Sequence, residues 1–157
     1  MNDLPEPARS IATAAAGAVA AARATDPEAF ATATATLAGR DAEQVGLVLG
    51  TVVRILLEDL HPDGLTAKDV RAVVARCVGE AASWYPEVDP DTVVVLLADA
   101  LGLYQSTEER PPLAATAVAT HGPIVIADLL GASGRPLDGY LRRAFADIAV
   151  SQAGELA

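Results

Sequence analysis

The chain has 157 residues, a formal net charge of −10 and a hydrophobic content of 52%. Its length fits a single domain that buries about 70% of the surface exposed by the unfolded chain. The acidic balance argues against nucleic acids and anionic membranes as partners, because both attract clusters of Lys and Arg. A mean hydropathy of +0.31 indicates more apolar surface than one domain conceals, which favours self-association.

The composition also bears on source and location. The single cysteine, Cys77, excludes an intramolecular disulfide, and its apolar neighbours predict a small buried thiol. Lys68 is the one lysine among 11 basic residues, which together with abundant Ala indicates a GC-rich bacterial genome. The N-terminal stretch MNDLPEPARS carries two acids and one Arg in place of the positive charge of a signal peptide. No apolar run reaches the roughly eighteen residues of a membrane span, so we expect a cytoplasmic protein.

The N-terminal region predicts two helices. Pro5 and Pro7 lead into an Ala-rich helix that ends near Ala24. Asp26 followed by Pro27 is typical of a helix cap with proline in the first turn. The alternation of Ala and Thr in AFATATATL has the period of a strand, but Ala gives no β preference, so we expect a second helix here.

Two amphipathic helices follow. The third helix begins at Asp41, and its apolar side chains recur every three or four residues, as in a helix that buries one face. Gly46 and Gly50 lie about one turn apart on it and predict tight packing against another helix. Thr66 followed by Asp69 indicates a capping box that opens the fourth helix.

The connection between these helices, HPDGLT, has features of both a metal loop and a turn. Asp59, Asp63 and Gly64 match positions 1, 5 and 6 of an EF-hand calcium loop. Position 12, which requires a bidentate Glu, is Val70, and position 3 is His61, a poor ligand for calcium. We therefore expect a helix-to-helix turn and no metal site.

The C-terminal half predicts three further helices. The first, near residues 91–104, opens at Asp89 and is apolar nearly all round, so we expect it to be the buried central helix. The next starts at Pro112 and is broken or kinked at Pro123. The last starts just after Pro136 and carries apolar residues on one face.

Together these segments predict an all-α fold, a single-domain bundle of about six or seven helices with a buried central helix near residues 91–104. The domain spans residues 1–157. We expect residues 1–8 to be flexible and the polar segment 105–112 to form an exposed linker between helices.

Residues that carry chemistry are few and widely spaced. His61 and His121 have no second metal ligand at helical spacing, and the chain has no glycine-rich phosphate loop or nucleophile elbow. We therefore predict no catalytic residue, metal or cofactor, while the sequence leaves enzymatic activity open. Aromatic residues near helix ends suggest a ligand-binding site, and the candidates are Trp84, Tyr104, His121 and Tyr140. The alternative is that they cap the core with their polar tips in water, with His121 bonded to a carbonyl.

Two charges interrupt apolar runs. Arg54 lies within VVRILL, and Asp99 lies within VVVLLADALGLY. If the third and fifth helices pack together, we expect these two residues to form a buried ion pair, because breaking such a pair leaves an uncompensated charge that costs about 3 to 5 kcal/mol. The alternative for Arg54 is a place on the rim of its helix with the guanidinium in water.

Two classes of function fit this pattern. Many apolar helical faces without catalytic spacing favour a non-catalytic domain that binds another protein or a second copy of itself, with a homodimer as the expected form. The alternative is a small-molecule-binding protein or enzyme with a pocket between helices, in which Arg54 or Asp99 is the polar anchor. Neither hypothesis involves nucleic acid or a membrane.

Overall fold

The computed structural model describes residues 4–156, and within this range the chain folds into seven α-helices without strands. They are α1 (Glu6–Arg23), α2 (Pro27–Ala38), α3 (Ala42–Leu60), α4 (Ala67–Ala82), α5 (Pro90–Ala100), α6 (Ala115–Ser133) and α7 (Leu137–Leu156). The predicted all-α, single-domain bundle is confirmed. The flexible segment expected at residues 1–8 lies partly outside the described residues, and α1 already begins at Glu6.

Polar side chains start four of the helices where the sequence predicts them. Asp26 and Asp41 each accept a backbone N–H group three residues ahead, at 3.1 and 3.0 Å. Thr66 and Asp69 form a complete capping box at α4, and Asp89 caps α5. Each cap satisfies an N–H group that the first helical turn leaves without a partner.

The centre of the bundle is α6, which packs against α1, α2, α3, α4 and α5. The shorter α5 is buried along one side only, through Thr92, Val93, Leu96 and Leu97. On its other side Val94 is 45% exposed. The prediction of a buried central helix at residues 91–104 is therefore wrong, because α5 ends at Ala100 and covers the bundle from outside.

Helix α6 runs through Pro123 without interruption, so of the predicted break or kink at this residue the break does not occur. Pro123 removes one helical hydrogen bond, but it is buried together with both of its neighbours, and packing compensates for the loss. The glycine before it lets α6 approach α3 closely, since a Cβ atom on Gly122 would stand 2.8 Å from Leu49 Cδ1. By length and composition α6 could cross a membrane, although half of its apolar window is buried inside the bundle.

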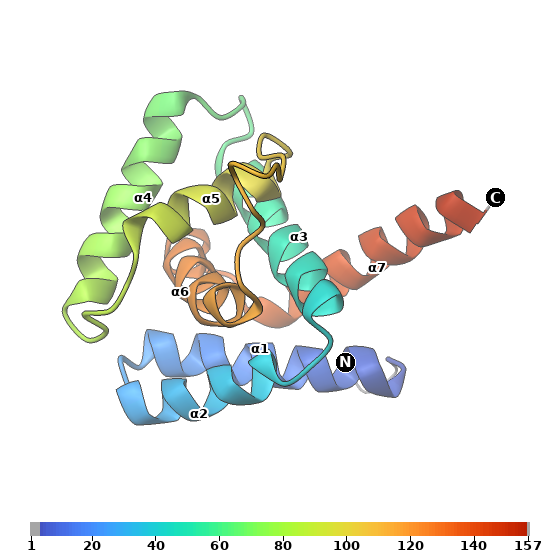
Figure 1. Ribbon diagram of the computed structural model, residues 1–157, viewed down its shortest axis with the longest axis horizontal. Coiled ribbons are helices and arrows are strands. Elements are labelled where there is room, and N and C mark those ends of the chain that lie inside the picture. The colour runs from blue at the N-terminus through green and yellow to red at the C-terminus, as the bar shows by residue number, and fades with distance from the viewer. Residues whose placement is uncertain (1–3, 157) are drawn as a thin grey trace.

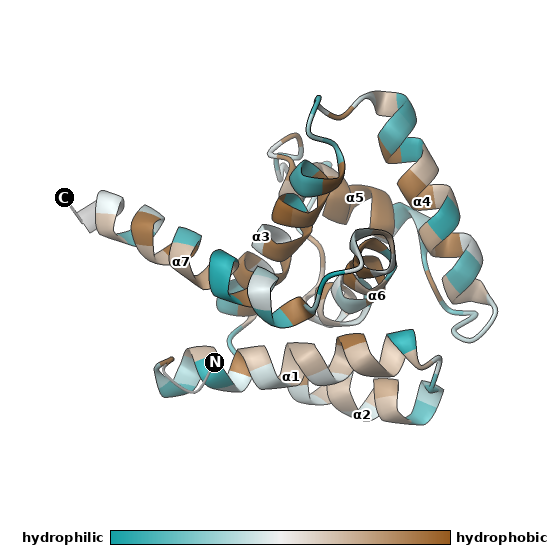
Figure 2. Ribbon diagram, turned by 180° about the vertical axis from the view of Figure 1, so that it is seen from behind, coloured by the Kyte–Doolittle hydropathy of each residue, from teal (hydrophilic) through white to brown (hydrophobic). Residues whose placement is uncertain are grey.

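The helices lie in an open arrangement around α6. An antiparallel pair, α1 and α2, lies across one side of the bundle, below the other helices in Figure 1. On the opposite side α4 and α5 pack together, and α3 packs against α6 and α7. The C-terminal part of α7 extends away from the bundle (Figure 1). Figure 2 shows the most hydrophobic residues on α3, α5 and α6, whereas the Ala-rich α1 and α2 are pale.

Candidate functional site

A groove of about 520 Å³ lies between α3, α5 and the connection that joins α5 to α6. We call it the α3–α5 groove. Its floor is the face of α3 that contains Gly46, Leu47 and Gly50, and its opposite wall is formed by Val95 and Leu96 of α5. The groove is larger than the other hollows described below, and most of these lining residues are apolar.

The two glycines of α3 leave the floor of the groove open. A Cβ atom built on either Gly46 or Gly50 would meet no heavy atom within 4 Å. The sequence suggested that these glycines permit tight packing against another helix, and this interpretation is wrong for the chain itself. Leu47, which lies between them, is 41% exposed, so a face suited to close helix approach carries an uncovered leucine.

The connection between α5 and α6 forms the outer wall of the groove. The Tyr104 hydroxyl donates to the Pro111 carbonyl at 2.7 Å, and the Arg110 guanidinium lies 5.8 Å from the centre of the Tyr104 ring. Between them, Thr107 and Arg110 form a turn through reciprocal backbone hydrogen bonds of 2.7 and 3.2 Å. Residues 105–112 are all exposed, yet the connection is held by its own contacts and places Tyr104 in the groove.

The predicted Arg54–Asp99 ion pair does not form, although both residues line the groove. Arg54 is bound instead to Glu58, one turn along α3, and to Asp147 of α7, each at 2.7 Å. Asp99 is exposed near the end of α5, so its carboxylate is accessible to solvent and needs no partner. The pair was expected because both residues interrupt apolar runs, but neither side chain is buried, so neither requires the other.

The four aromatic candidates do not share one site. Tyr104 lines the α3–α5 groove. Trp84 packs edge-on against Phe30, with ring centres 5.0 Å apart, and lines a different hollow. His121 is buried and bonded within the core, and Tyr140 is 3% exposed, with the Arg143 guanidinium over its ring. The alternative interpretation was that these rings cap the core with their polar tips in water and that His121 bonds a carbonyl. His121 does bond the Ala117 carbonyl, but both His121 and Tyr140 are buried.

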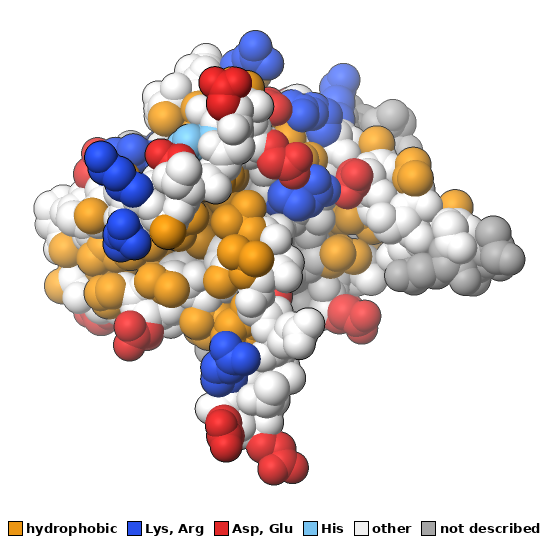
Figure 3. All heavy atoms as spheres, turned by 90° about the horizontal axis from the view of Figure 1, so that it is seen from above, with side chains coloured by type: hydrophobic (Ala, Val, Ile, Leu, Met, Phe, Trp, Pro, Cys, Tyr) orange, Lys and Arg blue, Asp and Glu red, His pale blue; other side chains and the backbone are white. Residues whose placement is uncertain are grey.

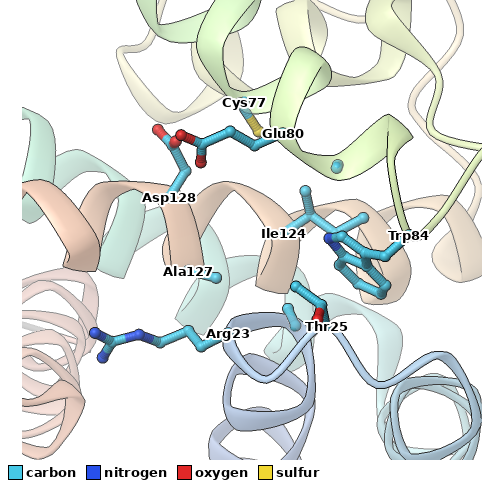
Figure 4. Close-up of a pocket in the computed structure, with 10 residues that line it drawn as sticks. Arg23, Thr25, Cys77, Glu80, Trp84, Ile124, Ala127 and Asp128 are labelled. Atoms are coloured by element: carbon cyan, nitrogen blue, oxygen red, sulfur yellow. The ribbon is translucent and has the colours of Figure 1, made fainter.

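A smaller hollow of about 210 Å³ lies between the end of α1, α4 and α6. Figure 4 shows the carboxylates of Glu80 and Asp128 at one edge of it and the Trp84 ring at another. Asp128 is bound by Arg76, and burial raises the pKa of the Cys77 thiol to about 12. A thiol with such a pKa stays protonated near neutral pH and does not act as a nucleophile.

A third hollow, of about 230 Å³, lies between α2 and α6 and is lined by alanine, threonine, proline and aromatic side chains without a charged group. Its lining offers no acid, base or metal ligand. In residues 4–156 there is also no cluster of three or more His, Cys, Asp or Glu side chains that could hold a metal ion.

The connection between α3 and α4 is a turn. Asp59, which would be the first ligand of a calcium loop, accepts two hydrogen bonds from Arg143 of α7, at 2.7 and 3.1 Å. These bonds lower the pKa of the Asp59 carboxyl. Thr66 at the other end of the connection serves as the cap of α4.

The comparisons with known proteins give no relative. No family model, no curated protein and no solved structure matches the chain. The sequence analysis missed Glu43 and Leu47, which line the groove beside the two glycines. One signal was available for Leu47, because it is an apolar residue outside the buried stripe of α3.

Proposed function

We propose that the protein is a non-catalytic binding domain that receives an α-helical segment of another protein in the α3–α5 groove. The observation that supports this proposal is the open face of α3, where Gly46 and Gly50 have free space above them and Leu47 is exposed. A face of this kind lets the backbone of a second helix approach closely, and flanking apolar side chains then bury its apolar stripe.

The dimensions of the groove suit a short helix. The α3 segment that lines it runs from Ala42 to Arg54, which is about 18 Å at roughly 1.5 Å per residue. A helix of about three turns covers that length and presents apolar residues at every third or fourth position. The side walls, Val95 and Leu96 on one side and Leu113 on the other, offer apolar contacts for this stripe.

Self-association is the competing form of this function. A second copy of the chain would bring another net charge of −10, so the two copies repel each other at a distance. Figure 3 shows hydrophobic side chains across the middle of one face of the molecule. This apolar surface could bind a second copy of the chain or a different protein equally well, so the charge decides between them. A different protein avoids the repulsion, and we therefore favour a heterologous partner over the homodimer.

A small ligand is the second candidate, favoured by one observation. The volume of the groove, about 520 Å³, lies within the roughly 300 to 1,000 Å³ of ordinary ligand sites, and Tyr104 and Arg54 supply polar groups. The polar group of each is already used, since Tyr104 donates to Pro111 and Arg54 binds two carboxylates. The other charged groups of the lining, Glu43 and Asp99, are exposed to solvent, so they would hold a small molecule less firmly than buried polar groups would.

The test uses a synthetic helical peptide of about 14 residues, or four turns, built from Ala, Leu and Gln with Leu at every third or fourth position. It carries no charged side chain, so its binding reports the apolar groove alone. Nuclear magnetic resonance titration of the 16.0 kDa protein locates the contact, and fluorescence anisotropy measures affinity. We expect perturbed resonances on the lining faces of α3 and α5.

The variant Gly46→Leu/Gly50→Leu fills the groove and should abolish binding while the fold is retained, because the space above both glycines is empty. The matched control is Gly79→Leu on α4, which is also a helical glycine with nothing within 4 Å of an added Cβ atom. Undiminished peptide binding by the filled variant, or resonance shifts confined to other helices, would refute the proposed function.

A further inference from the structure

We infer that the helix received by the α3–α5 groove is basic, with Lys or Arg beside its apolar stripe to pair with Glu43 and Asp99. This inference rests on the proposed function and adds the chemical character of the partner. It depends on which charges in the groove are already neutralised and which are not.

The one cationic side chain that lines the groove is neutralised within the protein. Arg54 binds Glu58 and Asp147, each at 2.7 Å, so its charge is matched twice. The two anionic side chains of the lining are Glu43 and Asp99, and both are exposed. Among residues 4–156 neither forms an ion pair or a side-chain hydrogen bond. A partner therefore meets two carboxylates that have no cationic side chain of this range beside them, in a groove whose lining is mostly apolar.

The position of Asp99 on its helix makes a cation especially favourable there. Asp99 lies in the last turn of α5, where the carbonyl groups carry the negative end of the helix dipole, and this turn contains no basic residue. A carboxylate at a helix C-terminus is unfavourable, whereas a cation at the same place is stabilised. A Lys or Arg of the partner would interact with the carboxylate and the helix end together.

The two carboxylates approach the groove from different helices. Glu43 lies in the first turn of α3, and Asp99 lies near the end of α5, which forms the opposite wall. The uncharged glycine face of α3 lies between Glu43 and Arg54 along the chain. Basic residues on both flanks of an apolar stripe would match this arrangement, whereas acidic residues would be repelled at each wall.

The net negative charge of the whole molecule also favours a positively charged partner. The net charge is −10, and the exposed turn of the outer wall carries Glu108 and Glu109 beside Arg110. A field of this sign attracts cationic segments and slows the approach of anionic ones, including a second copy of the chain. Binding of a basic helix should therefore weaken as salt is added.

The experiment compares three peptides that share the same Ala and Leu positions and differ only in the flanking residue, which is Lys, Gln or Glu. Anisotropy titrations at low salt should give the affinity order Lys, then Gln, then Glu, with about a tenfold difference between Lys and Glu for two exposed ion pairs. Added salt should bring the three affinities together. Equal affinities for the Lys and Glu peptides would overturn the inference.

A charge-matched pair of variants assigns the effect to the groove. Glu43→Gln/Asp99→Asn should lower the affinity for the Lys peptide about threefold to tenfold and leave that for the Gln peptide unchanged. The control, Glu28→Gln/Asp63→Asn, removes the same two charges at exposed positions on α2 and in the α3–α4 connection. An equal loss in the control would show a general charge effect and overturn the assignment to Glu43 and Asp99.

The two proposals fail in different ways. If the neutral Gln peptide binds and the filled variant Gly46→Leu/Gly50→Leu abolishes that binding, the groove is a helix site whatever the Lys and Glu peptides do. If the neutral peptide binds in the groove but flanking charge has no effect, only the basic character of the partner is refuted. If the Gln peptide and the Lys peptide both bind the filled variant as tightly as the wild type, both proposals are refuted.

Discussion

The Nε2 atom of His121 in α6 accepts the backbone N–H of Asp89 at 3.0 Å. Because Nε2 is the acceptor, Nδ1 carries the proton, and it donates to the Ala117 carbonyl 3.0 Å away. Asp89 in turn caps α5, since its carboxylate accepts the Asp91 N–H at 3.2 Å, and it also accepts the Thr92 hydroxyl at 2.7 Å. One buried imidazole thus attaches the start of α5, a wall of the α3–α5 groove, to the central helix.

Replacing this histidine should release the start of α5. His121→Leu removes the acceptor for the Asp89 N–H and should lower the free energy of unfolding by about 1 to 3 kcal/mol, measured by urea denaturation. His121→Gln should cost less, because its side-chain carbonyl can accept the same N–H. The control His61→Leu affects a half-buried ring whose hydrogen bond is to the Leu57 carbonyl of α3 and holds no other helix. A loss at His61 as large as that at His121 would contradict this role.

The ion pair between Arg76 and Asp128 should contribute more to the free energy of unfolding than the pair between Arg143 and Asp59. Arg76 donates to both carboxylate oxygens at 2.9 to 3.1 Å, and the Asp128 side chain is only 5% exposed. Arg76→Met leaves that carboxylate buried without a counter-charge, so we expect a loss of about 3 kcal/mol in the free energy of unfolding.

The comparison is Arg143→Met, which breaks the pair with Asp59. The Asp59 side chain is 29% exposed and can be solvated, so this change should cost about 0.5 kcal/mol. Urea denaturation of both variants measures the difference. Equal losses would mean that burial of Asp128 does not decide the strength of its ion pair.

The helix starts could be predicted because their causes are local. Asp26, Asp41, Thr66 and Asp89 each cap a helix through an N–H group within three residues, so the sequence contains the complete motif. The position of a helix within the bundle has no such local signature. The sequences of α5 and α6 are both rich in apolar residues on most sides of the helix. The sequence pattern therefore does not tell which of the two is central, and only the folded chain shows that it is α6.

The candidate site was less accessible to sequence analysis for the same reason. The partner of Arg54 on α7, Asp147, is 93 residues away, a separation that no helical spacing encodes. The small-residue face at Gly46 and Gly50 was recognised, but a sequence does not tell whether the chain's own helices cover such a face. Tyr104 is the one aromatic candidate that lines the groove, because it belongs to the α5–α6 connection that forms the outer wall of the groove.

Substitutions at two glycines of α6 should have opposite effects on stability, because one of them lies in close contact with α3 and the other does not. A Cβ atom at Gly122 would lie 2.8 Å from Leu49 Cδ1, and Leu49 is fully buried, so Gly122→Val should cost about 1 to 3 kcal/mol through overpacking. Gly131→Ala meets nothing within 4 Å and should gain about 0.5 to 1 kcal/mol from helix propensity. Thermal unfolding of both variants tests this, and stabilisation by Gly122→Val would contradict the close approach.

Burial of Cys77 in α4 should make the protein sensitive to alkali. Burial raises the pKa of its thiol from 9.0 to about 12, and the Asp128 carboxylate adds to the shift. The folded chain therefore holds the thiol proton at pH values where the unfolded chain releases it. The stability that depends on this difference is complete below the unfolded pKa and is lost as the pH rises from 9.0 towards about 12.

Cys77→Ala isolates this contribution from those of the other groups that titrate in alkali. The variant leaves a small cavity, which should lower stability by a constant amount of about 1 kcal/mol at every pH. Above pH 9.0 the wild-type curve should fall more steeply, so the two free energies of unfolding should converge as the pH rises. Urea denaturation at a series of pH values measures both curves. Parallel curves would mean that the thiol can ionise within the folded chain, which requires water to reach Cys77 from the hollow beside it.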